Sequence, residues 1–192
     1  GGPSADALQD SIITGNQFRW PNATVPYTID PAMPNQAIVT DALAVWRANS
    51  VVRFVVRTTE ADYVTFRSGD GCSSSVGRRG GQQFITLGDG CSTWNAVHET
   101  GHALGLWHTQ SREDRNTYVT IDFSKIQPGM EHNFDQHITD GTDILSYNYQ
   151  SVMHYGATAF STDGSPTIVT KGKQSIGQRE YLSEIDIAAV TT

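Results

Sequence analysis

The 192-residue sequence has few cysteines, fewer basic than acidic residues and no long apolar run, and these absences exclude several classes of protein. It has only two cysteines, and its 13 Lys and Arg residues are outnumbered by 20 Asp and Glu residues, which gives a formal net charge of −7. A nucleic-acid-binding protein needs clustered basic side chains against the phosphates, so nucleic acid is not an expected partner. No run approaches the roughly 18 apolar residues of a membrane-spanning helix, so we expect no membrane partner either.

The first half of the chain carries regular patterns. Apolar residues at helical spacing, with Trp46 among them, predict a helix over about 35–48, and a second helix is predicted over about 92–104. Strand-like segments stand at 25–29, 51–57, 63–67 and 82–87, the last after a turn signal at Gly80-Gly81.

After Gly105 the pattern loosens, because residues 106–180 are rich in Gly, Asp, Asn and Ser. Ser183 is a candidate N-cap for a final helix through Val190, whose Ile185 and Ala188 or Ala189 are expected to face the core.

The most informative stretch is H-E-T-G-H-A-L-G-L-W-H at residues 98–108. In a helix, His98 and His102 lie about 6 Å apart along the axis on one face, a spacing that holds Zn²⁺. Glu99 points beside such a metal, where a general base acting on water belongs. Gly105 allows the left-handed turn that returns His108 as a third ligand. The alternative is that these histidines are simply packed helix residues.

Three neutral imidazoles with one open position favour a single tetrahedral Zn²⁺ per chain over other metals. Downstream, Ser151-Val152-Met153-His154-Tyr155 supplies a Met-centred turn. In the metzincin class of zinc peptidases, such a Met lies beneath the three imidazoles. We expect His154 to pack or hydrogen-bond locally, whereas His132 and His137 have no motif context.

The run from His98 through Arg112, Asp114 and Arg115 resembles the extended zinc signature of the astacin family, and residues 151–155 resemble that family's Met-turn. Further similarity in the segments 19–29, 72–91 and 166–170 extends the resemblance over nearly all of residues 16–190. The resemblance implies a secreted zinc endopeptidase that acts on proteins or peptides, with the fold of a metzincin.

The family also suggests roles for individual residues. Tyr155 matches a phenol that ligates zinc at rest and then hydrogen-bonds the reaction intermediate, although it could merely pack after the turn. Lys171 follows the segment that shapes the pocket for the residue after the scissile bond, and some relatives with a basic side chain there prefer acidic residues. Its alternative is an exposed loop lysine beside Lys173.

Cys72 and Cys91 bracket the predicted hairpin, and from the residues alone they could form a disulfide, remain free thiols or bind metal. The family places a disulfide at matching positions, and a disulfide implies an oxidising, extracellular compartment.

One position departs from the family pattern. Astacins usually carry Glu directly after the third His, where it receives the ammonium of the mature N-terminus, but this chain has Thr109. That terminus would fall near Ser11. We therefore expect a leader over 1–10, in which residues 1–4 resemble a cloning scar and residues 5–10 are either a propeptide remnant or a native extension.

The expected fold is α+β: a two-lobed catalytic domain over 11–192, with lobes over about 11–105 and 106–192. The first lobe should hold a twisted sheet and two helices, and the second should be irregular with a final helix. A zinc-binding module without catalysis would have little reason to keep Glu99, so we expect turnover. A zinc enzyme that cleaves small amides or esters is the remaining alternative.

Overall fold

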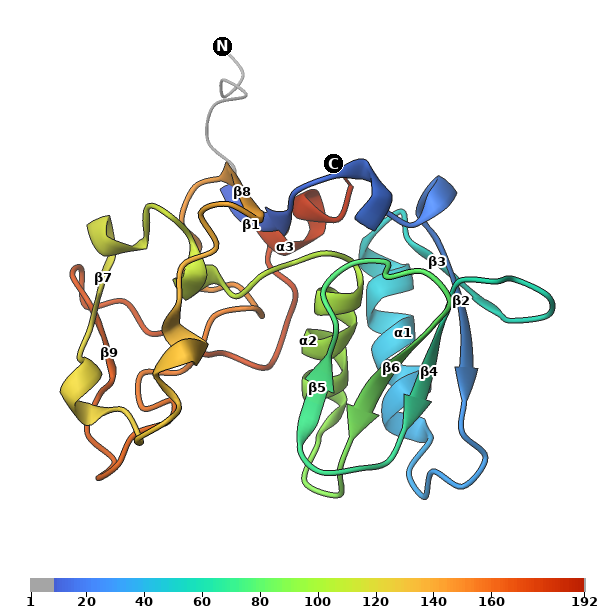
Figure 1. Ribbon diagram of the computed structural model, residues 1–192, viewed down its shortest axis with the longest axis horizontal. Coiled ribbons are helices and arrows are strands. Elements are labelled where there is room, and N and C mark those ends of the chain that lie inside the picture. The colour runs from blue at the N-terminus through green and yellow to red at the C-terminus, as the bar shows by residue number, and fades with distance from the viewer. Residues whose placement is uncertain (1–8, 192) are drawn as a thin grey trace, which may run out of the picture. The chain divides into compact units, whose positions relative to one another are not determined.

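A computed structural model describes residues 9–191 of the chain (Figure 1). Those residues divide into two compact units: a sheet unit of residues 13–106 with 190–191, and a loop unit of residues 9–12 with 107–189. Residues 1–8 of the expected leader lie outside the described residues.

The sheet unit is built on one five-stranded sheet. Its strands are β2 (Thr24–Ile29), β3 (Arg53–Val56), β4 (Tyr63–Arg67), β5 (Cys72–Ser74) and β6 (Gln82–Leu87), in the order β3-β2-β4-β6-β5. The pairs β2–β3, β2–β4 and β4–β6 are parallel, whereas β5 pairs antiparallel with β6. The predicted hairpin is therefore β5–β6, at one edge of the sheet.

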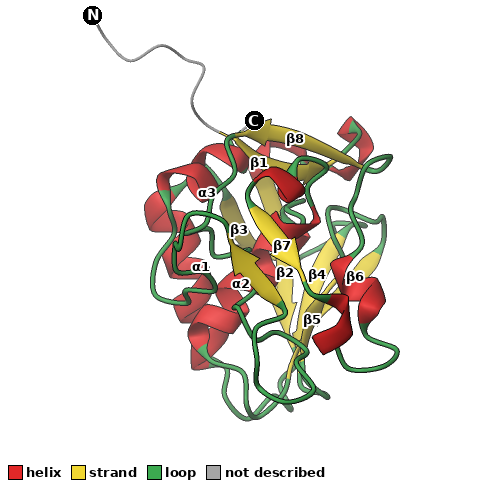
Figure 2. Ribbon diagram, turned by 90° about the vertical axis from the view of Figure 1, so that its left-hand side faces the viewer, coloured by secondary structure: helices red, strands yellow, loops and turns green. Residues whose placement is uncertain are grey.

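Two helices lie side by side against this sheet, α1 (Ala37–Asn49) and α2 (Thr93–Ala103), and Figure 2 shows them beside the strands. Trp46 of α1 is fully buried, and its indole N–H donates to the carbonyl of Val97 in α2 at 3.1 Å. Alternate strand residues, among them Val64, Phe66 and Ile85, are each about 1% exposed. Burying each such side chain contributes about 1.5–3 kcal/mol, which stabilises the sheet unit.

The loop unit has little regular structure. It contains β7 (Val119–Ile121), β8 (Gly141–Leu145), β9 (Ile168–Thr170) and α3 (Glu184–Ala189), with single turns of 3-10 helix between them. β7 pairs antiparallel with β9, and β8 pairs with β1 (Gln9–Ile13). A small apolar core lies at its centre, formed by Val119, Ile126, Phe134, Tyr147 and Ile168.

Two buried arginines hydrogen-bond backbone carbonyls of the loop unit, which has few helices and strands to satisfy them. Arg112 is 0% exposed, binds both carboxylate oxygens of Asp114 at 2.8 and 2.7 Å, and donates to the carbonyl of Leu145 at 3.0 Å. Arg115 donates to the carbonyls of Gln110 and Phe134. Each guanidinium therefore satisfies backbone carbonyls of the loop unit that would otherwise need other donors.

The α+β class, the sheet with two helices and the irregular second part are confirmed. The expected face of the final helix is wrong in one respect: Asp186 and Ala189 are buried, while Ile185 is only half-buried. Asp186 is accommodated because its carboxylate accepts hydrogen bonds from the backbone and hydroxyl of Ser183 and from Ser151 and Val152.

Candidate metal centre and active site

The helix that carries the first two histidines begins with a complete capping box. Ser92 Oγ accepts from the backbone N–H of Asn95, and the Asn95 side chain accepts from the backbone N–H of Ser92 at 2.9 Å. Helix α2 then presents His98 and His102, whose ring centroids lie 4.8 Å apart with perpendicular planes. Each imidazole is only 6% exposed, so both are held by packing.

The turn after α2 fixes the proton on His102. Gly105 has a φ of +109°, and a Cβ there would lie 3.0 Å from an Nη of Arg19, so glycine suits both the backbone and the space. The chain then returns so that the carbonyl of Leu106 lies 2.7 Å from His102 Nδ1. Because a carbonyl can only accept, Nδ1 carries the proton and Nε2 keeps a lone pair for a metal.

His108 lies on a short segment that is held on both sides. The N–H of Trp107 donates to the carbonyl of Ser11 at 2.9 Å, and the N–H of Thr109 donates to the carbonyl of Met153 at 3.2 Å. Ring nitrogens of His98, His102 and His108 all lie within 4.8 Å of one another, the one such group of potential ligands found among residues 9–191. Three imidazoles, one with its tautomer already set, fit Zn²⁺.

Glu99 follows the first of these histidines on α2. It is 7% exposed, in a helix whose residues from Ala96 to Ala103 are all buried. A carboxylate in such surroundings is largely shielded from bulk water.

The predicted Met-turn is a compact, buried turn. The N–H of His154 donates to the carbonyl of Ser151 at 3.1 Å, and Met153 is fully buried. The ring of Tyr155 lies 4.3 Å from the ring of His108 (centroid to centroid), and its backbone N–H donates to the side-chain oxygen of Gln110. The structure thus places Tyr155 next to the third histidine.

His154 hydrogen-bonds locally, as predicted. Its Nδ1 lies 2.8 Å from the carbonyl of Tyr155 and its Nε2 lies 2.7 Å from the hydroxyl of Tyr147. Burial lowers the pKa of His154 to about 4, so the ring is neutral at physiological pH. Burial also raises the pKa of the Tyr147 phenol, which therefore stays protonated and can donate to His154.

Thr109, the residue that departs from the family pattern, and Asp10, the last residue of the expected leader, are both buried. Each side chain is 0% exposed, and neither Thr109 Oγ1 nor Asp10 Oδ2 has a hydrogen-bond partner among the described residues. Burial first, and then the nearby carboxylate of Asp186, raise the pKa of Asp10 well above its usual value. The expected boundary after residue 10 falls inside β1, and Asp10 is part of the folded core.

The other predicted residues are placed as follows. Cys72 and Cys91 form a disulfide with their Cα atoms 6.1 Å apart, which links β5 to the start of α2 and confirms that expectation. Lys171 directly follows β9, and its ammonium donates to the carbonyl of Asn116.

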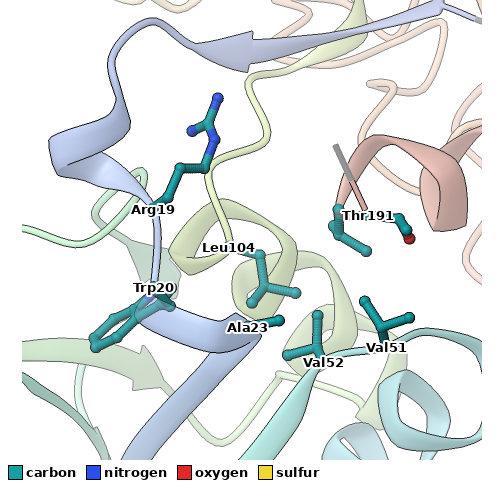
Figure 3. A pocket seen from close by; sticks show the side chains of 8 residues that line it. Arg19, Trp20, Ala23, Val51, Val52, Leu104 and Thr191 are labelled. Carbon is teal, nitrogen blue, oxygen red and sulfur yellow. The ribbon is translucent and has the colours of Figure 1, made fainter.

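A pocket of about 180 Å³ in the sheet unit contains none of the predicted site residues (Figure 3). It is lined by Arg19, Trp20, Ala23, Val51, Val52, Leu104, Val190 and Thr191. None of the helices in the described part of the chain is long and apolar enough to span a bilayer.

The sequence model of the Astacin peptidase family matches residues 12–192, which is nearly the whole chain. The chain therefore belongs to the astacin family.

Among its relatives, the beta subunit of meprin A from Homo sapiens is 40% identical over 189 residues, which cover 94% of this chain and 27% of the relative. Zinc metalloproteinase nas-13 from Caenorhabditis elegans is 38% identical over 187 residues, covering 94% of this chain and 42% of the relative. The chain thus spans less than half the length of each of these two curated relatives.

A solved structure agrees with the sequence comparison. High choriolytic enzyme 1, a hatching-enzyme zinc protease from Oryzias latipes, superimposes with a TM-score of 0.82 at 34% identity, covering 90% of each chain. Myroilysin superimposes with a TM-score of 0.66 at 21% identity, covering 94% of this chain and 96% of that one, and shares the fold.

Proposed function

We propose that this chain is the catalytic domain of a secreted zinc-dependent endopeptidase, with His98, His102 and His108 as the zinc ligands. The convergence of three imidazoles on one point, in a chain of the astacin family, is the observation that carries the proposal. Bound there, Zn²⁺ would act as a Lewis acid and lower the pKa of a coordinated water to near 7.

Glu99 supplies the general base. Its carboxylate takes a proton from the attacking water and returns that proton to the departing amine, so that one residue serves both halves of the reaction. Its position on α2, directly after the first proposed ligand, supports this role, because the carboxylate can then lie beside the metal without ligating it.

Tyr155 supplies a hydrogen-bond donor to the oxyanion that forms as water adds to the peptide carbonyl. The contact of its ring with His108 supports this assignment, since the phenol belongs to the same local cluster as a ligand. A donor of this kind is worth most in the transition state, where the negative charge is greatest.

The edge strand β5 supports peptides as substrates. β5 lies at one end of the five-strand order, with β6 as its sheet neighbour, and the disulfide at Cys72 anchors it. An extended peptide can add to such an edge through its backbone, whatever its side chains are. Lys171 is our candidate for reading an acidic residue after the scissile bond.

The disulfide also supports an extracellular location, because structural disulfides persist in oxidising compartments.

The test is to incubate the zinc-loaded protein with a diverse peptide library and with casein, with and without a chelator, and to read the products by mass spectrometry. We expect internal cleavages that the chelator abolishes and added zinc restores. Cleavage of small amides or esters with intact peptides would indicate a different hydrolase, and zinc binding without any cleavage would indicate a binding module.

A further inference from the structure

The indole of Trp107, the residue before the third histidine, is stacked on an imidazole from a distant loop. The ring centroids of Trp107 and His137 lie 3.6 Å apart and their planes differ by only 10°. The His137 side chain is 27% exposed, so the pair is a packed contact at the surface of the loop unit. Nothing in the local sequence around His137 indicated this partner.

Three polar contacts fix the positions of the two stacked rings. His137 Nδ1 lies 3.0 Å from a carboxylate oxygen of Asp140, which fixes the rotation of the imidazole. The indole N–H of Trp107 donates to the backbone carbonyl of the same Asp140 at 3.3 Å. The backbone N–H of His137 donates to the carbonyl of Ser111 at 2.8 Å.

These contacts span His108. The loop around His137 is attached to Trp107 on one side of the histidine and to Ser111 on the other, so the segment 107–111 cannot shift without breaking one of them. His108 itself follows a glycine turn and lies outside any helix of more than one turn. Unlike His98 and His102, it is not positioned by helix α2, and its geometry depends on what holds its neighbours.

We propose that His137 is a positioning residue, which fixes His108 for metal binding by stacking on Trp107. This inference rests on the proposed zinc site, and it assigns His137 no contact with substrate or metal. The flat imidazole acts through its face, and Asp140 keeps that face parallel to the indole. A histidine with no motif context thereby becomes part of the metal centre's support.

The experiment measures zinc affinity by chelator competition, together with kcat and KM, for wild type, His137→Ala, His137→Phe and the control His132→Ala. His132 is an exposed histidine in the same region of the loop unit, and it makes no ring contact with any described residue. Loss of support around a metal ligand typically lowers metal affinity by about 10- to 100-fold. We expect His137→Ala to show a loss in this range with lower kcat and little change in KM, and His137→Phe to recover most of it.

The visible spectrum of the cobalt-substituted protein gives a readout that a purely structural role would not change. His137→Ala should alter the ligand-field bands, whereas His132→Ala should not. If His137→Ala fails to fold, Asp140→Asn, which keeps the backbone carbonyl but weakens the hold on the imidazole, should shift zinc affinity and the spectrum in the same direction to a smaller extent.

The inference is overturned if His137→Ala melts earlier but matches His132→Ala in zinc affinity, kcat and spectrum, or if His137→Phe is as defective as His137→Ala. Failure of the proposed function looks different. In that case the wild-type protein itself would bind zinc no better than His98→Ala.

Discussion

The hydroxyl of Ser151, which opens the Met-turn, donates a 2.5 Å hydrogen bond to the carboxylate of Asp186 in α3. Both residues are 0% exposed. The same Ser151 oxygen accepts from the N–H of Met153 at 2.9 Å, so one buried hydroxyl joins the turn to the final helix.

Replacing Ser151 by Ala should therefore destabilise the protein by about 1–3 kcal/mol, because a buried carboxylate loses a donor and a buried N–H loses its acceptor. Urea unfolding measures this. Ser124→Ala is the matched control, since Ser124 donates to Asp122 at the same 2.5 Å in an exposed turn. We expect the control to cost less than about 0.5 kcal/mol, and equal costs would show that the buried link does not anchor the turn.

Tyr155→Phe removes a single hydroxyl. If that hydroxyl stabilises the oxyanion, kcat should fall by roughly 10²-fold with little change in KM, because the contact is made mainly in the transition state. Steady-state kinetics on one good peptide provides the measurement. Tyr181→Phe, which removes an exposed phenol that donates to Gln150, should leave kcat unchanged. An unchanged kcat in Tyr155→Phe would reduce Tyr155 to a packing residue.

Lys171→Glu tests whether Lys171 selects an acidic substrate residue after the scissile bond. The Lys171 ammonium donates to the carbonyl of Asn116, which leaves further N–H donors for a substrate carboxylate. A charge-assisted contact favours Asp or Glu after the scissile bond by about 1–3 kcal/mol, or about 5- to 150-fold. Cleavage profiles of wild type, Lys171→Glu and the control Lys173→Glu decide the matter. An acidic preference that survives in Lys171→Glu, or is missing from wild type, rules Lys171 out.

Asp10→Asn tests the buried carboxyl of β1. Its pKa is raised in the folded state, so the folded protein holds this proton to higher pH than the unfolded chain does. The wild-type unfolding free energy should therefore lose a contribution as pH rises from about 4 through the folded-state pKa. The stability of Asp10→Asn relative to wild type should increase over that range and then level off. Asp135→Asn, an exposed carboxyl, controls for loss of one charge, and parallel curves would contradict the assignment.

Local patterns were sufficient to predict α2 and the placement on it of the two histidines proposed as ligands. The strand bounds of β4 and the span of α2 follow from alternation and helical spacing within a few residues. His98 and His102 are one turn apart, and Gly105 explains the return to His108, so this part of the site needs no long-range information.

The supports of the site are the part that could not be predicted. Asp186 hydrogen-bonds Ser151, which lies 35 positions earlier in the sequence, and His137 stacks on Trp107, which lies 30 positions earlier. No periodicity links such pairs. A helical aspartate is expected to face solvent unless it has buried hydrogen-bond donors, and the sequence does not show such donors. The sequence therefore predicts Ile185, and not Asp186, on the buried face of α3. Backbone carbonyls such as that of Leu106 carry no side-chain signal at all.

The most direct test of the account is the zinc content and peptide hydrolysis of Glu99→Ala, measured on the same sample. Glu99 is proposed to be the base and not a ligand, so the variant should retain about one zinc per chain while hydrolysis falls below detection. His108→Ala, by contrast, should lose zinc itself. If Glu99→Ala loses its zinc, Glu99 is a ligand, and if it still cleaves peptides at the wild-type rate, the proposed mechanism is wrong.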